Sequence, residues 1–212
     1  MESIGYVATA FAAYFMGSVP SGFLAGKAKG IDIRATGSGN IGATNVTRAL
    51  GKKIGILVLI VDMLKGFLAC RLAPLIALRL AGLELADLDP LHERFAVIGG
   101  LCAILGHNYT CWLKFKGGKG IATTCGALLA LMPIVGLICI VSWLVVLALS
   151  RYVSLASLAA AVAVPISAWA TNRSSLMIGV ALILGTLAIF KHKDNIRRLI
   201  AGTEQRIGKK KP

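Results

Sequence analysis

The sequence predicts an all-α integral membrane protein with seven transmembrane helices, some of them short or broken, in a single domain over residues 1–212. Three observations predict this fold class. Hydrophobic residues make up 57% of the chain and charged residues only 15%, which is too apolar for a soluble domain. Several apolar runs are long enough for a span, which needs about 20 residues to cross a hydrocarbon core of roughly 30 Å. Most lysines and arginines lie in short segments between these runs.

The first three spans are predicted from the first three apolar runs. The run over residues 4–26 follows no basic segment of the kind that precedes a cleaved signal peptide, so we expect a retained helix. After a polar segment over residues 35–53, a second run covers residues 54–72 and extends as far as Leu80 at most. A third run covers residues 95–108.

The apolar stretch over residues 121–150 is predicted to form two helices, because Pro133 lies in its middle and proline ends or kinks a helix. Two spans and one bent span both remain open. A helix over residues 121–132 would be only about 18 Å long, so the preceding turn, residues 116–120, must dip into the membrane. Irregular backbone at that depth lines a cavity, and the positive end of a half-helix there favours an anion.

Two later runs, residues 153–170 and 175–190, complete the seven helices and place the N-terminus outside and the C-terminus in the cytoplasm. The distribution of positive charge supports this topology. Eighteen of the 23 Lys and Arg residues then lie in inner segments, four lie outside, and Lys65 lies within the bilayer. The outer loop, residues 82–93, is acidic, and His92 within it is assigned to solvent.

The charge and the cysteines exclude several other classes of protein. A formal net charge of +14 would suit nucleic acid only if it formed a basic face on a soluble module, whereas here the cations lie between apolar runs. The five cysteines show no C-x-x-C spacing, so we expect them to be small buried hydrophobic residues. The polar clusters are cationic, and we expect no metal and no cofactor.

The segment ATGSGNIGATNVTRALGKK, residues 35–53, has the composition of a phosphate-binding loop lying against a membrane. Glycine lets backbone N–H groups close on an anion, side-chain hydroxyls and amides add donors, and a cation balances the charge. The residues concerned are Gly37, Ser38, Gly39, Asn40, Gly42, Thr44, Asn45 and Arg48. A flexible connector is the alternative, although it would not need these polar side chains. The G-x-G-x-x-G spacing also occurs in dinucleotide sites, but those require a strand before it.

Four more polar residues lie where a site could form. Asp62 and Lys65 share a helix face within an apolar run, so either they form a structural ion pair or they contact a substrate. His107 and His192 lie where two helices meet the inner surface, and each is either a polar helix end or part of the site.

The C-terminal segment, residues 191–212, is predicted to be a basic helix held at the inner surface by anionic lipid headgroups. Asn195 and Arg198 follow His192 by about one helical turn, so all three side chains can face one cavity. Residues 209–211 are expected to be solvated.

Five motifs occur in order along the chain: GSGNIGATNVTRALGKK, D-x-x-K-G from Asp62, GHNYTCWLKFKGGKGIATTCG from Gly106, RYVSLAS from Arg151 and HKDNIRRLIAGTE from His192. Together they resemble the bacterial acyl-phosphate:glycerol-3-phosphate acyltransferase family over most of the chain. Thr110 departs from that family, which usually has proline at this position. We expect this difference to loosen the turn into the lysine patch without abolishing activity.

The resemblance implies transfer of a fatty acyl group from acyl phosphate to the 1-hydroxyl of glycerol 3-phosphate, at the cytoplasmic face of a bacterial inner membrane. The implied partners are these two substrates and membrane lipids, with no nucleic acid. The implied catalytic residues are Ser38, Arg48, Lys119, His192 and Asn195. The implied substrate-binding residues are Gly37, Gly39, Asn40, Gly42, Thr44, Asn45, Asp62, Lys65, His107, Lys116, Gly117, Gly118 and Arg198.

Direct attack of the hydroxyl on the acyl phosphate is the expected mechanism, because the mixed anhydride already has a good leaving group. The sequence contains neither a G-x-S-x-G elbow nor a histidine followed five residues later by aspartate. Asp62 and His192 are the side chains to test as proton acceptors. A transporter of a phosphorylated metabolite is the main alternative, but no second copy of either glycine-rich segment accompanies the first. A structural lipid-binding protein would not need its polar sites on one face.

Overall fold

The computed structural model describes the backbone of residues 2–81 and 85–208, and the side chains of these residues other than 81 and 85–90. The described part is helical, with ten α-helices and two 3-10 turns, so the predicted all-α class is confirmed. The chain divides into two compact units, residues 1–131 and 132–212.

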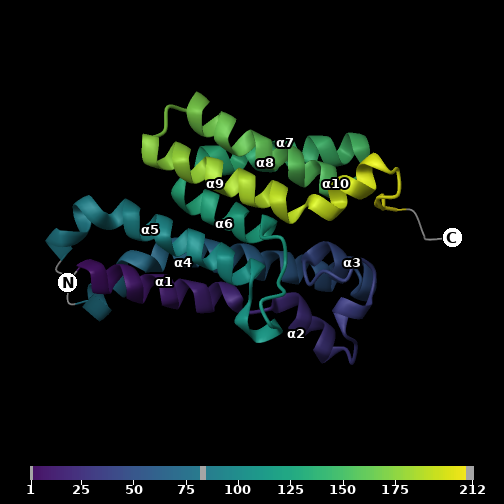
Figure 1. Cartoon of the computed structure of the whole chain (residues 1–212), viewed down its shortest axis with the longest axis horizontal. Helices are drawn as coiled ribbons and strands as arrows, with labels where there is room; N and C mark the ends of the chain where they lie inside the picture. Colours follow the sequence, from purple (N-terminus) through teal and green to yellow (C-terminus); the bar gives the residue numbers. More distant parts are fainter. Residues whose placement is uncertain (1, 82–84, 209–212) are drawn as a thin grey trace. The chain divides into compact units, whose positions relative to one another are not determined.

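The first unit is built around α4 (Lys52–Ala81), which packs against α1, α3, α5 and α6. Figure 1 shows α1, α4 and α5 running side by side. Gly66 of α4 lies against the backbone of Thr123 in α6, so these two helices approach closely. The elements of this unit are α1 (Glu2–Ser18), α2 (Ser21–Ala28), η1 (Ile33–Ala35), α3 (Ala43–Leu50), α4, α5 (Leu85–Asn108), η2 (Cys111–Leu113) and α6 (Ile121–Leu131).

Two predicted boundaries in this unit are wrong. The first apolar run forms two helices, because Pro20 cannot donate the backbone hydrogen bond that would continue α1 into α2. The third helix begins at Leu85, ten residues before the predicted start, so most of the predicted outer loop is helical. Leu91, within the added part, and Phe95, at the predicted start, pack against Ala73 and Ala77 of α4, and this packing favours the longer helix.

Over residues 132–208 the second unit contains four helices, of which α8 packs against both α7 and α9. The predicted break at Pro133 is confirmed: Met132 has a non-helical conformation (φ −140°, ψ 72°) and Pro133 is the first residue of the next helix, a position that needs no N–H donor. The elements are α7 (Pro133–Ser150), α8 (Val153–Ala170), α9 (Ser175–Lys191) and α10 (Lys193–Ile200). The predicted solvation of residues 209–211 lies outside the described residues.

Helices occupy all seven ranges in which spans were predicted. By length and composition, four stretches of the described chain can cross a membrane: residues 2–28, 91–113, 133–150 and 153–170. A fifth is added if α9 and α10, which meet at 58°, form one bent span. Exposed leucines, isoleucines and valines cover much of α4 and α7, as expected for helices that face lipid rather than water.

Candidate functional site

The polar segment between η1 and α3 forms a compact loop, residues 36–42, organised by one side chain. Asn45, which is 2% exposed, lies in the first turns of α3 with its amide turned back into the loop. Its Nδ2 lies 3.0, 3.0 and 2.9 Å from the carbonyl oxygens of Ile33, Thr36 and Asn40. Its Oδ1 accepts a hydrogen bond from the backbone N–H of Ser38 (2.9 Å). Asn45 therefore holds the loop in shape and leaves the Ser38 side chain exposed.

Two glycines of this loop adopt backbone conformations that other residues rarely take. Gly37 and Gly39 have φ angles of 57° and 70°, in the left-handed region that glycine enters without steric cost. A Cβ atom at Gly37 would also collide with Oδ1 of Asn45. Asn40 closes the loop, because its Oδ1 accepts from the N–H of Gly42 (2.8 Å) immediately before α3.

The entry to this loop is fixed by an ion pair. Asp32 accepts hydrogen bonds from the backbone N–H of Arg34 (3.0 Å) and from its guanidinium Nη2 (2.7 Å). The side-chain hydrogen bond from Arg34 lowers the pKa of Asp32 to about 2. Arg34 also lies over the ring of Phe23 in α2. Arg34 is thus engaged by Asp32. Arg48 lies in the last turn of α3 and is exposed.

The second glycine-rich segment, residues 114–120, folds back onto the end of α5. The N–H groups of Gly117 and Gly118 donate to the carbonyl oxygens of Asn108 (3.2 Å) and His107 (3.0 Å). A Cβ atom at Gly117 would collide with the His107 carbonyl, and one at Gly118 with the His107 ring. The loop therefore needs glycine at both positions and presents the half-buried Lys119 just before α6.

Thr110, where the sequence departs from the family pattern, does not loosen this turn. Its φ of −64° is one that proline would also adopt. Its carbonyl accepts from the N–H groups of Leu113 (3.2 Å) and Phe115 (2.9 Å), and its hydroxyl donates to the carbonyl of Ser18 (2.6 Å), a bond that proline cannot make. The expected loosening is thus not seen.

The two loops lie at the same end of the first unit because they share a hydrophobic core. Ile33, Ile41 and Val46 from the first loop and its flanks pack with Val58 of α4 and with Leu113 from the turn before the second loop. This packing brings the glycine-rich backbone, Ser38 and Arg48 to the end of the unit that also carries Lys116 and Lys119. The structure thereby places the two glycine-rich segments at one end of this unit.

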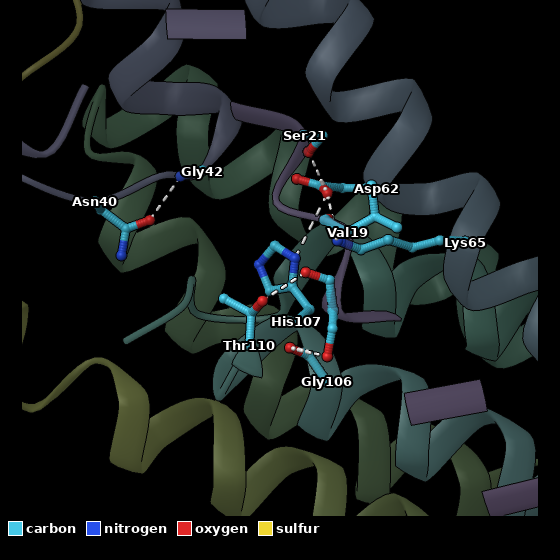
Figure 2. A network of polar contacts seen from close by, with 10 residues as sticks. Val19, Ser21, Asn40, Gly42, Asp62, Lys65, Gly106, His107 and Thr110 are labelled. Atoms are coloured by element: carbon cyan, nitrogen blue, oxygen red, sulfur yellow. Dashed lines mark hydrogen bonds and ion pairs between the residues drawn. The ribbon is translucent and has the colours of Figure 1, made fainter. Parts of the chain in front are cut away.

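Asp62 and Lys65 form a buried ion pair beside these loops (Figure 2). The carboxylate of Asp62 is within 2.8 Å of Lys65 Nζ, accepts from Ser21 Oγ (2.7 Å), and lies 3.5 Å from His107 Nδ1. Lys65 also donates to the carbonyl of Val19 (3.0 Å). The residues are 1% and 6% exposed, so of the two roles left open by the sequence, the geometry favours the structural ion pair.

The remaining predicted site residues belong to the second unit. His192 lies buried at the junction of α9 and α10, with Nδ1 2.7 Å from the carbonyl of Ala188. Since a carbonyl only accepts, Nδ1 carries a proton, so Nε2 is the basic nitrogen whenever the ring is neutral. Asn195 and Arg198 are brought together by Glu204, which accepts from Asn195 Nδ2 (2.7 Å) and Arg198 Nε (2.6 Å).

Glu204 is the residue that sequence reasoning missed. It also accepts from the hydroxyl of Ser154 in α8 (2.8 Å) and thereby ties the C-terminal segment to that helix. The segment docks further through the N–H of Ile207, which donates to the carbonyl of Arg151 (2.9 Å). The available signal was charge: Glu204 and Asp194 are the two acids in a strongly basic segment.

We expect Glu204→Gln to reduce the loss of thermal stability in acid. Burial alone would raise the pKa of Glu204, but hydrogen bonds from Arg198, Ser154 and Asn195 outweigh it and hold this pKa below its usual value of 4.5. A carboxylate with a lowered native pKa stabilises the fold fully above its unfolded pKa, and this contribution is lost as the pH falls through the native value. Because the group is partly exposed, its contribution is about 1 kcal/mol.

The measurement is the unfolding temperature of the detergent-solubilised protein between pH 7 and pH 3. The unfolding temperature of the wild type should fall below about pH 4.5. That of Glu204→Gln should be lower than the wild type's at pH 7 and should fall less between pH 7 and pH 3. Asp194→Asn is the matched control, because Asp194 is exposed and 3.6 Å from Arg197. Equal acid losses in the wild type and the Gln variant would show that Glu204 does not carry the effect.

A family model, related sequences and a solved structure all match this chain to the same family of proteins. The family model described as glycerol-3-phosphate acyltransferase matches residues 7–202. A protein of that name from Geobacter sulfurreducens is 45% identical over 92% of this chain and 93% of its own length. One from Desulforamulus reducens is 46% identical over the full length of both chains. The crystal structure of PlsY, an integral membrane glycerol 3-phosphate acyltransferase in its glycerol 3-phosphate form, matches with a TM-score of 0.85 and 38% identity over 96% of both chains.

Proposed function

Because the chain belongs to the glycerol-3-phosphate acyltransferase family, a group of multi-pass membrane enzymes in phospholipid synthesis, we propose that it uses acyl phosphate as donor. The 1-hydroxyl of glycerol 3-phosphate attacks the acyl carbonyl carbon, the new ester bond forms, and the bond to the phosphate oxygen breaks. The products are 1-acyl-glycerol 3-phosphate and inorganic phosphate. The observation that carries this proposal is the pairing of two glycine-rich anion-binding loops, because both substrates carry a phosphate.

The hydrogen-bond donors of the first unit differ in how accessible they are to a substrate. Ser38, Arg48 and Lys119 are exposed or half-buried, and we assign them to the phosphates and to the carbonyl oxygen where charge develops during attack. Asn45 is taken up by the loop itself and acts by positioning Ser38. The loop residues assigned to substrate binding are Gly37, Gly39, Asn40, Gly42, Thr44, Lys116, Gly117 and Gly118. The N–H groups of Gly39, Gly42, Gly117 and Gly118 donate within the protein, so these four glycines act by shaping the loops.

The second unit contributes His192, Asn195 and Arg198 to the proposal. Nδ1 of His192 is committed to Ala188, so Nε2 is the atom with which it would contact a reacting group. Asn195 and Arg198 are oriented by Glu204. The proton of the attacking hydroxyl passes to a phosphate oxygen of the substrate, and His192 is the side chain to test as an alternative acceptor.

The product and the topology complete the proposal. A solved relative at 37% identity is described as the lysophosphatidic acid form of PlsY, which agrees with the proposed product. We place the protein in the bacterial inner membrane with seven spans, the N-terminus outside, and the site facing the cytoplasm. The concentration of lysine and arginine in the segments assigned to the inner side supports this orientation.

We expect the purified protein to release phosphate from acyl phosphate only when glycerol 3-phosphate is present, and to form lysophosphatidate in equal amount. The measurement combines phosphate release with product analysis, and an acyl thioester offered in place of acyl phosphate serves as the donor control. If lysophosphatidate formed equally fast from the thioester and from acyl phosphate, acyl phosphate would not be the specific donor that we propose. Binding of glycerol 3-phosphate without any release of phosphate would favour the transporter alternative, and flux across vesicles would then be the next measurement.

A further inference from the structure

The break between α1 and α2 lies at the centre of a polar cluster, defined here as Ser21, Asp62, Lys65 and His107 (Figure 2). Proline has no N–H, so Pro20 ends α1 and leaves carbonyl groups beyond the helix hydrogen-bond pattern. The ammonium group of Lys65, which reaches the Val19 carbonyl from α4, supplies a donor for one of them. The cluster thus fixes the position at which α2 begins.

The position of α2 in turn determines that of the first loop. Ser21 is the first residue of α2 and donates to Asp62. The next residue, Gly22, lies so close to the loop that a Cβ atom there would collide with the carbonyl of Ile41. A displacement of Ser21 therefore moves the backbone that carries the first loop.

His107 connects the same carboxylate to the second loop. Its Nδ1 lies 3.5 Å from Asp62 Oδ1, while its carbonyl accepts from the N–H of Gly118 (3.0 Å) and its ring packs against Gly118. Lys119 is the following residue. Oδ1 of Asp62 thus contacts Ser21, whose neighbour Gly22 lies against the first loop, and His107, which contacts the second loop.

We propose that Asp62 is a positioning residue that holds the two phosphate-binding loops in register, through Ser21 to the first and His107 to the second. The inference rests on the proposed function for the identity of the ligand, glycerol 3-phosphate. An ion pair alone would not explain the arrangement, because a buried pair is often no more stabilising than apolar residues of the same size. The same carboxylate oxygen also accepts a hydrogen bond from Ser21 and lies 3.5 Å from His107 Nδ1, so it has a specific use beyond pairing with Lys65.

Two double variants test the proposal. Asp62→Asn/Lys65→Met and Asp62→Leu/Lys65→Met both remove the buried charges, and Asn and Leu are similar in size. Only Asn keeps an acceptor oxygen for Ser21 and His107. We expect both variants to unfold at similar temperatures, but the Leu variant to bind glycerol 3-phosphate at least tenfold more weakly and to have a KM for it at least tenfold higher than the Asn variant. Single Asp62→Asn should unfold at a lower temperature than either, because it leaves Lys65 buried without its counter-charge.

The other outcomes overturn the proposal. If Asp62 were the general base, both double variants would lose kcat equally, by a thousandfold or more, at unchanged binding of glycerol 3-phosphate. If the pair only stabilised the fold, the two double variants would bind and turn over equally per folded molecule. Direct calorimetric binding of glycerol 3-phosphate separates this test from that of the proposed function. A wild type that binds glycerol 3-phosphate but transfers no acyl group would refute the reaction, while the Asn-to-Leu difference in binding would still decide the role of Asp62.

Discussion

The Lys119→Ala variant is expected to lose two to three orders of magnitude in kcat, with its thermal stability little changed. Lys119 follows Gly118, whose N–H is fixed to His107, and precedes Gly120, which enters α6 with a left-handed φ of 81°. The lysine is therefore held on a rigid turn rather than on a mobile one. Removal of one preorganised group that faces developing negative charge lowers kcat by about 10² to 10³.

Initial rates of phosphate release at saturating glycerol 3-phosphate measure this effect. Lys114→Ala is the matched control, because it removes one positive charge from the same segment at an exposed position, and it should retain most of the activity. A loss smaller than tenfold in Lys119→Ala would show that this cation does not face the reacting groups. Comparable losses in both variants would indicate that the net charge of the loop matters rather than the position of Lys119.

The helices of this protein were predictable to the extent that apolar runs coincide with them. Pro133 interrupts an apolar run beside Met132, and the predicted break is present because proline suits the first residue of α7. Pro20 causes a similar break, but the apolar composition continues across it, so one helix was predicted where there are two, although residues 2–28 still form one candidate span. The early start of α5 depends on the packing of Leu91 and Phe95 against α4, which composition alone does not reveal.

The candidate site shows the same division between chemistry and geometry. Residue type and spacing identified the two glycine-rich loops, because glycine, hydroxyl, amide and cation together have few structural uses. They did not identify Glu204, whose partners Ser154 and Asn195 lie 50 and 9 residues away in sequence. Nor did they separate Asn40 from Asn45, which are both amides in one motif. Only the fold shows that Asn45 faces inward and bonds the backbone of residues that precede it.

The Asn45→Asp variant is expected to lose at least a hundredfold in kcat/KM, by deforming the first loop. The substitution replaces the Nδ2 donor with an oxygen that would face the carbonyl oxygens of Ile33, Thr36 and Asn40 at 2.9 to 3.0 Å. Lost donors and a buried charge without a partner together cost about 3 to 5 kcal/mol. The left-handed conformations of Gly37 and Gly39 would then no longer be held, and Ser38 would lose its position.

Steady-state kinetics with limited proteolysis of the loop measure both consequences, and Asn40→Asp is the matched control. Both substitutions add one negative charge to the same anion-binding loop, so both weaken attraction to phosphate. They differ in geometry, because the Asn40 side chain uses its oxygen to accept from Gly42 (2.8 Å), and a carboxylate preserves that bond. We therefore expect a smaller loss and no new cleavage in Asn40→Asp. If the two variants lost activity equally and neither became sensitive to protease, repulsion of the phosphate would explain both, and Asn45 would have no separate structural role in the loop.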